Sequence, residues 1–102
     1  MDITFKECDA SDALEARILV YAAKLERIYD RITRCEVVVE PPRHRGSGFA
    51  VRIRLTVPGG EIVTRSVSGD AYVAVHDAFV SLRRQLDEFA HQLRHEHRRI
   101  AV

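Results

Sequence analysis

Histidines and cysteines are the side chains of this sequence whose spacing could carry metal or redox chemistry. His91 and His95 lie one helical turn apart, a spacing that lets two imidazoles share a metal ion, but no third ligand is evident. Cys8 and Cys35 have neither metal-binding nor thioredoxin-like spacing, so we expect reduced, partly buried thiols. We therefore expect surface histidines, no metal site and no cofactor.

Catalytic motifs are missing from the sequence as well. It contains no nucleophile elbow, no phosphate-binding loop and no serine, histidine and aspartate whose convergence the sequence suggests. The stretch VPGGE at residues 57–61 has too few glycines to cradle a phosphate, and a tight turn explains it better. We expect that the protein is not an enzyme.

Without a metal site or a catalytic motif, the charged side chains are the remaining candidates for a function. The chain has 16 basic and 15 acidic residues, and its formal net charge of +1 provides no strong overall field for nucleic acid. RNA binding would therefore require that basic side chains gather on one part of the surface. Which of them gather depends on the helices and strands that carry them.

Length and composition predict one cytoplasmic domain over residues 1–102. A chain of this length buries about 60% of its unfolded surface, and its 46% hydrophobic and 30% charged residues lie in the globular range. No stretch approaches the roughly 18 apolar residues of a membrane span, and neither end carries a basic flank followed by an apolar run. We expect no membrane association.

The first half of the chain reads as a strand, a helix and a second strand. Residues 3–8 form the first strand, and a helix over 12–29 follows, capped by the hydroxyl of Ser11. Residues 34–40, RCEVVVE, alternate with the period of a strand until two prolines stop it. The residues that recur at helical spacing are Leu14, Ile18, Tyr21, Leu25 and Ile28.

The second half reads as a hairpin followed by a helix. Residues 49–57, FAVRIRLTV, are the clearest strand, and Pro58 with Gly59 or Gly60 turns the chain back into a strand over 61–68. The side chains expected to face inward on that last strand are Ile62, Thr64 and Ser66.

The last helix begins after Asp70, whose carboxylate can accept the free amide hydrogens of the first turn. We expect it to reach about Leu93. Its predicted buried stripe comprises Tyr72, Val75, Ala78, Phe79, Leu82, Leu86, Phe89 and Leu93.

These elements predict an α+β fold of order β-α-β-β-β-α. Each helix has one apolar stripe and each strand one apolar face, so the two helices must pack on one face of a four-stranded mixed sheet. The first two strands should be parallel and the rest antiparallel. The other face of the sheet is left to solvent or a partner.

The sequence resembles the family of ribosome hibernation-promoting factors and ribosome-associated translation inhibitors, also described as sigma-54 modulation proteins, in its short form. The similarity runs from Ile3 to about Leu93 and includes the strings SDALEARI, KLERI, PGGEI, GDAYVAVHDAF and RRQL. The positions that match residues typical of the family are Asp70, Tyr72, Val75, Asp77, Arg84, Gln85 and Leu86. We expect Asp70 to act as a helix cap and Tyr72 as a core residue.

This resemblance implies a non-enzymatic protein that docks on the small ribosomal subunit, in the channel used by messenger and transfer RNA. Its occupation of that channel would silence translation during starvation. The resemblance makes Lys24, Arg27 and Arg84 the best candidates for contacts with ribosomal RNA phosphates, because these positions are basic in the family.

Further basic side chains fall on two surfaces. At 100° per residue, Arg83, Arg94 and Arg98 share a flank and the outer face of the last helix with Arg84, although an ordinary solvated face is the alternative. A second set lies in the linker and on the open sheet face, where its members could equally pair with Glu36, Glu40 and Glu61. This set comprises Arg52, Arg54 and Arg65 of the sheet and the linker residues Arg43 and Arg45. We count the two linker arginines, like Arg83, Arg94 and Arg98, among the candidates for RNA binding.

Departures from the family pattern leave a second function open. Relatives often carry lysine where this chain has Ser81 and Glu88, and a basic residue where it has Glu15 or Tyr21, so RNA affinity could be weak. The first helix also carries an apolar strip opposite its core face, which suggests a homodimer contact. That strip comprises Ala16, Leu19, Val20 and Ala23, with Leu19 and Val20 at its centre. The alternative is thus a protein-interaction module, as a monomer or a homodimer, with the same fold and little RNA affinity.

Overall fold

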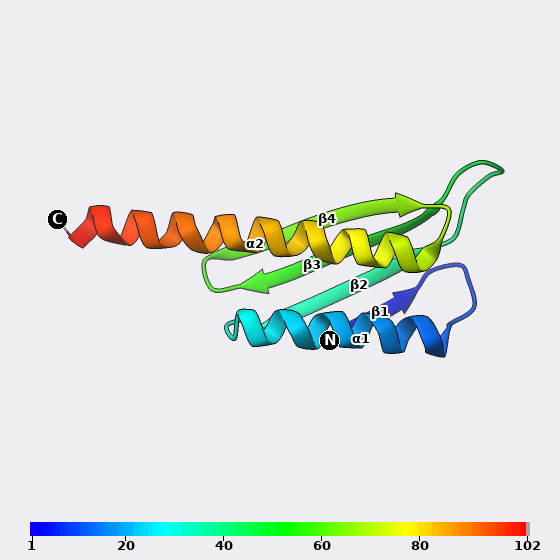
Figure 1. The fold of residues 1–102 in the computed structure, drawn as a ribbon, viewed down its shortest axis with the longest axis horizontal. Helices are drawn as coiled ribbons and strands as arrows, with labels where there is room; N and C mark the ends of the chain where they lie inside the picture. The colour runs from blue at the N-terminus through cyan, green and yellow to red at the C-terminus, as the bar shows by residue number, and fades with distance from the viewer. Residues whose placement is uncertain (102) are drawn as a thin grey trace.

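The order of helices and strands in the computed structural model is the predicted one (Figure 1). The structure describes the backbone of residues 1–101 and the side chains of residues 1–92. Its elements are β1 (Asp2–Phe5), α1 (Asp12–Ile28), β2 (Arg34–Glu40), β3 (Phe49–Val57), β4 (Gly60–Ser68) and α2 (Ala71–Ala101).

The four strands form one mixed sheet in the order β1-β2-β3-β4. β1 runs parallel to β2 because α1 carries the chain back across the sheet, whereas β2, β3 and β4 are antiparallel neighbours. Ile3 pairs with Val37, which pairs with Ile53, which pairs with Thr64. The inward residues therefore form rows across the sheet and give it a single apolar face, as predicted.

Both helices pack side by side on that face and leave the other one open (Figure 1). Ile18 of α1, Ile53 of β3 and Leu82 of α2 are fully buried in one core. Thr64 is the buried polar residue of the described core, and its hydroxyl donates a hydrogen bond of 3.3 Å to the Ala78 carbonyl of α2. The predicted α+β architecture is confirmed.

Both helices begin at the capping residues predicted from the sequence. Ser11 Oγ accepts a hydrogen bond from the Leu14 amide at 3.2 Å, and Asp70 Oδ1 accepts one from the Tyr72 amide at 2.8 Å. Each oxygen satisfies an amide that has no partner within its own helix. These caps fix where α1 and α2 begin.

Several element ends differ from the prediction. β1 stops at Phe5 rather than at residue 8 because Glu7 has a φ of 59°, which an extended strand cannot contain. α1 ends at Ile28, since Tyr29 is already extended, and α2 continues to Ala101 instead of stopping near residue 93. Gly59 takes the positive φ of the hairpin turn, 94°, so β4 begins at Gly60.

Two residues of the apolar stripes read from the sequence are exposed in the structure, so the prediction that Tyr72 is a core residue is wrong. Tyr72 is 40% exposed, because it lies in the first turn of α2, where its ring contacts the Arg17 guanidinium at 5.6 Å instead of the sheet. Ile28 is 46% exposed and lines the groove between the helices. Ala74, absent from the predicted stripe, is fully buried. Leu93 lies outside the described side chains.

Both cysteines are free thiols. Cys8 is half-buried, whereas Cys35 is buried in β2. Desolvation by burial raises the pKa of Cys35 to about 11, so this thiol stays protonated at neutral pH and is a poor nucleophile. None of the described helices has the length and apolar character needed to cross a membrane.

Replacing Ile18 by alanine tests the packing of α1 on the sheet. Because Ile18 is fully buried, Ile18→Ala should lower the free energy of unfolding by about 2–5 kcal/mol in urea denaturation. Ile28→Ala is the matched control on the same helix, and its exposed side chain predicts a change within about 0.5 kcal/mol. Equal losses in the two variants would contradict the observed packing.

Candidate nucleic-acid interface

A groove of about 200 Å³ runs between α1 and α2 on the helical face of the molecule. Its floor is apolar and consists of Tyr21 and Leu25 from α1 and Phe79 from α2. Lys24 of α1 and Arg83 of α2 also line it, one from each helix. The pairing of the two helices on one sheet face thus brings together cations that are 59 residues apart in the sequence.

Three rings form a cluster at this groove. The rings of Tyr21 and Phe79 are stacked with centroids 5.4 Å apart and planes inclined by 30°. His76 meets the Tyr21 ring edge-on at 5.9 Å. Aromatic pairs in such geometries attract beyond their burial, so the half-buried Tyr21 ring is held in one orientation.

The basic side chains on the helical face are free of acidic partners. Lys24, Arg27, Arg83 and Arg84 are all exposed, and none takes part in an ion pair within the described part of the chain. The Lys24 ammonium lies 6.0 Å from the centre of the Tyr21 ring instead. These four cations are therefore available to an anionic partner.

Only two of the four lie in the groove itself. Arg84 follows Arg83 in the helix and points about 100° further round α2, and Arg27 occupies the outer side of α1. The structure thus places Lys24 and Arg83 together and spreads Arg27 and Arg84 to either side of them. Sequence reasoning missed the Tyr21–Phe79 stack, because the contact depends on how the helices pair.

The other predicted cations do not join this group. The loop between β2 and β3 extends from the end of the sheet at which both helices begin, whereas Lys24 lies toward the far end of α1 (Figure 1). Within this loop Arg43 pairs with Glu40 at 3.3 Å, and Arg45 is exposed. Arg94 and Arg98 lie outside the described side chains.

The open face of the sheet neutralises much of its own charge. Arg34 pairs with Asp2 at 3.5 Å and with Glu36 at 2.8 Å. Arg54 pairs with Glu61 at 3.8 Å, one of the pairings left open by the sequence. This face is therefore a poorer site for a polyanion than the helical face.

Arg52 and Arg65 are the exception on the open face. They sit directly opposite each other on β3 and β4, and neither has an acidic partner among the described residues. Like charges in directly opposed positions of antiparallel strands repel. We therefore expect this pair of arginines to lower the stability of the sheet.

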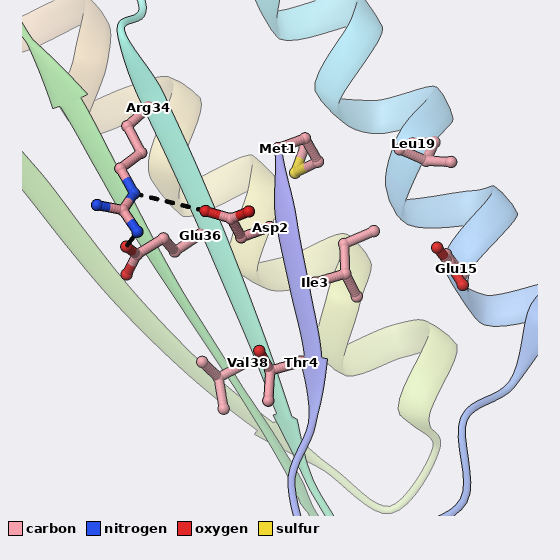
Figure 2. A pocket seen from close by; sticks show the side chains of 9 residues that line it. All are labelled: Met1, Asp2, Ile3, Thr4, Glu15, Leu19, Arg34, Glu36 and Val38. Carbon is pink, nitrogen blue, oxygen red and sulfur yellow. Dashed lines mark ion pairs between the residues drawn. The ribbon is translucent and has the colours of Figure 1, made fainter.

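A wider hollow of about 730 Å³ lies at the β1 edge of the sheet (Figure 2). Met1 and Ile3 extend from β1 on the side that faces α1, and Leu19 lines the hollow from α1 (Figure 2). Leu19 is 46% exposed and its neighbour Val20 is 50% exposed. The two central residues of the predicted apolar strip are thus exposed, and Leu19 lies next to the sheet edge.

Histidines give no sign of a metal centre in the part of the chain that the structure describes. No group of three potential ligands converges there. His76 contacts the Asp77 carboxylate at 3.3 Å, and His91 is exposed. His95 lies outside the described side chains.

Comparison with known proteins finds relatives over nearly the whole chain. Residues 1–94 match the family described as sigma 54 modulation protein / S30EA ribosomal protein. The ribosome hibernation promoting factor of Escherichia coli (strain K12) is 30% identical over 94 residues, which is 92% of this chain and 96% of that protein. The ribosome hibernation promoting factor of Shigella flexneri shows the same identity and coverage.

Solved structures share the fold. A ribosomal subunit interface protein from Coxiella burnetii superimposes with a TM-score of 0.78 at 20% identity, covering 87% of this chain and 94% of that one. The N-terminal domain of Thermus thermophilus Protein Y gives a TM-score of 0.73 at 23% identity, covering 87% and 99%. At such identities the superposition supports the architecture alone.

Replacing Arg65 by glutamate tests the unpaired charges on the open face. Because Arg65→Glu sets a carboxylate opposite Arg52, it should raise the free energy of unfolding by about 0.2–1 kcal/mol at low salt, measured by urea denaturation. Arg65→Gln, which removes only the repulsion, should give a smaller gain. A glutamate variant less stable than the glutamine variant would contradict the cross-strand arrangement.

Proposed function

The chain belongs to the sigma 54 modulation protein / S30EA ribosomal protein family, and from this membership we propose that it is a ribosome-associated translation inhibitor. In this proposal it acts by binding the small ribosomal subunit, in the channel that messenger and transfer RNA use. It performs no catalysis: its effect is to occupy space that translation requires. Its place of action is the cytoplasm, where ribosomes work.

The observation that carries the proposal is the unpaired basic surface on the helical layer. Lys24, Arg27, Arg83 and Arg84 are exposed and have no carboxylate partner among the described residues, although the whole chain has a net charge of only +1. The open sheet face, by contrast, pairs Arg34 and Arg54 with acids. The four cations on this side are thus free to contact RNA phosphates, although the same helices also expose acids such as Asp77 and Glu88.

Arginine and lysine suit ribosomal RNA for different reasons. A guanidinium fork donates two parallel hydrogen bonds to one phosphate, whereas an ammonium acts as a compact point charge. Each phosphate neutralised releases a condensed counterion, so binding weakens steeply as salt rises. Four such groups across two adjacent helices can follow a folded backbone without reading its sequence.

Two positions limit the affinity expected. Ser81 is half-buried and its hydroxyl accepts a hydrogen bond from the Gln85 amide at 3.3 Å, and Glu88 is an exposed acid. Neither side chain brings a positive charge to a phosphate, as a lysine at that position would. We therefore propose ribosome binding through fewer phosphate contacts and with a shallower salt dependence.

Replacing three of the cations tests the proposal. The triple variant Lys24→Ala/Arg27→Ala/Arg84→Ala should bind purified small ribosomal subunits more weakly, and its plot of log affinity against log salt should be flatter by about 2–3 units. Sucrose-gradient co-sedimentation across a salt series measures both. Circular dichroism checks that the variant remains folded.

The matched control is Arg34→Ala/Arg43→Ala/Arg54→Ala, which removes the same charge from arginines that already pair with acids. It should keep most of the wild-type affinity and slope. If both triple variants lose binding equally, net charge rather than the helical face is responsible. If the wild-type chain never enters the ribosomal fractions, the proposed function is wrong.

A second candidate function rests on the exposed strip of α1. We propose that Leu19, which lines the hollow at the β1 edge, and its neighbour Val20 form a contact between two copies of the chain; they are 46% and 50% exposed. Removing such aliphatic surface from water favours association. This would make the protein a dimeric interaction module, with or without RNA affinity.

Sedimentation velocity at micromolar concentration tests the dimer. The wild-type chain should sediment as two copies, and Leu19→Glu/Val20→Glu should sediment as one, because the glutamates would bring charge into an apolar contact. The control Val63→Glu/Val67→Glu alters valines of β4 that are 44% and 48% exposed, and should leave association unchanged. A monomeric wild-type chain would exclude the contact.

A further inference from the structure

The groove between α1 and α2 combines an apolar floor with a cationic rim. Tyr21 and Phe79 form the floor, while Lys24 and Arg83 stand on opposite helices beside it. No carboxylate is among the described residues that line this groove. The combination matches the two chemical parts of a nucleotide, a flat aromatic base and a charged phosphate.

The Tyr21 ring is held in place before any ligand arrives. Phe79 stacks on it at 5.4 Å between centroids, and His76 contacts it edge-on at 5.9 Å. A ring that is fixed in this way loses little conformational freedom when a base packs against it. Tyr21 therefore provides a preorganised stacking surface.

Lys24 links the ring to the phosphate. Its ammonium lies 6.0 Å from the Tyr21 centroid, at the outer limit of a cation–π contact. A phosphate attracts this ammonium more strongly than the ring does, because the phosphate carries a full negative charge. Movement of Lys24 toward a phosphate would leave the ring face to the base.

We propose that this groove holds one unpaired nucleotide of RNA, with its base against Tyr21 and its phosphate between Lys24 and Arg83. The groove of about 200 Å³ is smaller than the ~300–1,000 Å³ of sites for drug-sized ligands. It therefore accommodates a single base rather than a larger ligand. Val80 and Ile28, 56% and 46% exposed at the rim, add apolar surface around that base.

This inference deepens the proposed function and rests on it. A surface that only neutralises phosphates binds single-stranded and base-paired RNA through charge alone. A groove that holds a single base, which we call the base seat, requires an unstacked nucleotide. Loops, bulges and single strands supply such a nucleotide, whereas a continuous duplex does not. The groove thus selects unpaired RNA within whatever ribosomal surface the helices face.

Short synthetic RNAs test the base seat directly. Fluorescence anisotropy should show that the wild-type chain binds a single-stranded adenosine hexamer about 5- to 150-fold more tightly than an abasic hexamer with the same phosphates. The hexamer within a duplex should bind as weakly as the abasic strand. Equal affinity for the normal and abasic hexamers, or no binding of either, would overturn the inference.

Variants identify the ring responsible. Tyr21→Leu keeps an apolar side chain but removes the stacking surface, so it should bind the normal hexamer as weakly as the wild type binds the abasic one, with an unchanged salt slope. Lys24→Ala/Arg83→Ala should instead flatten that slope by about 1.4 units, since it removes two phosphate contacts.

The matched control is Tyr29→Leu, which alters a half-buried tyrosine at the end of the same helix but outside the groove. It should bind the hexamer like the wild type. A loss equal to that of Tyr21→Leu would overturn the inference. A chain that co-sediments with small subunits but does not distinguish abasic from normal RNA would refute the base seat while leaving the proposed function intact.

Discussion

The burial of one sheet face beneath two helices is the constraint from which the rest of the molecule follows. Ile18, Ile53 and Leu82 meet in a single core, and that core needs both helices side by side to exclude water. Two helices that lie side by side leave a groove between them on the outer surface. Because charged residues are excluded from the sheet side of each helix, the charged side chains of α1, and those of α2 up to residue 92, lie at this groove or on the outer surface.

The two faces differ in how their cations are paired. On the open sheet face, ladder positions set Arg54 near Glu61 and Arg34 near Glu36, so much of the charge is neutralised locally. On the helical face the four exposed cations have no such partners in the described structure. In the proposed function, ribosomal RNA is the anionic partner that would neutralise these cations.

Local rules predicted most of the fold. Alternation of Val37 and Val39 with polar neighbours defines β2, and the hydroxyl of Ser11 and the carboxylate of Asp70 define the helix starts. These rules failed where the burial of a residue depends on contacts between elements. Tyr72 has the spacing of a core residue, yet its ring contacts Arg17 rather than the sheet. The basic positions were predictable from sequence, but the stack of Tyr21 on Phe79 was not, since no pattern within one helix reports the facing residue of another.

Hydroxyl-radical footprinting of the chain bound to small ribosomal subunits tests most directly whether the helical face is the one that meets RNA. Oxidation of Tyr21 and His76 should fall on binding, because both rings lie at the groove, while oxidation of Val63 and Val67 on the open sheet face should stay at its free level. Protection of the two valines with the groove rings still oxidised at the free rate would contradict the account.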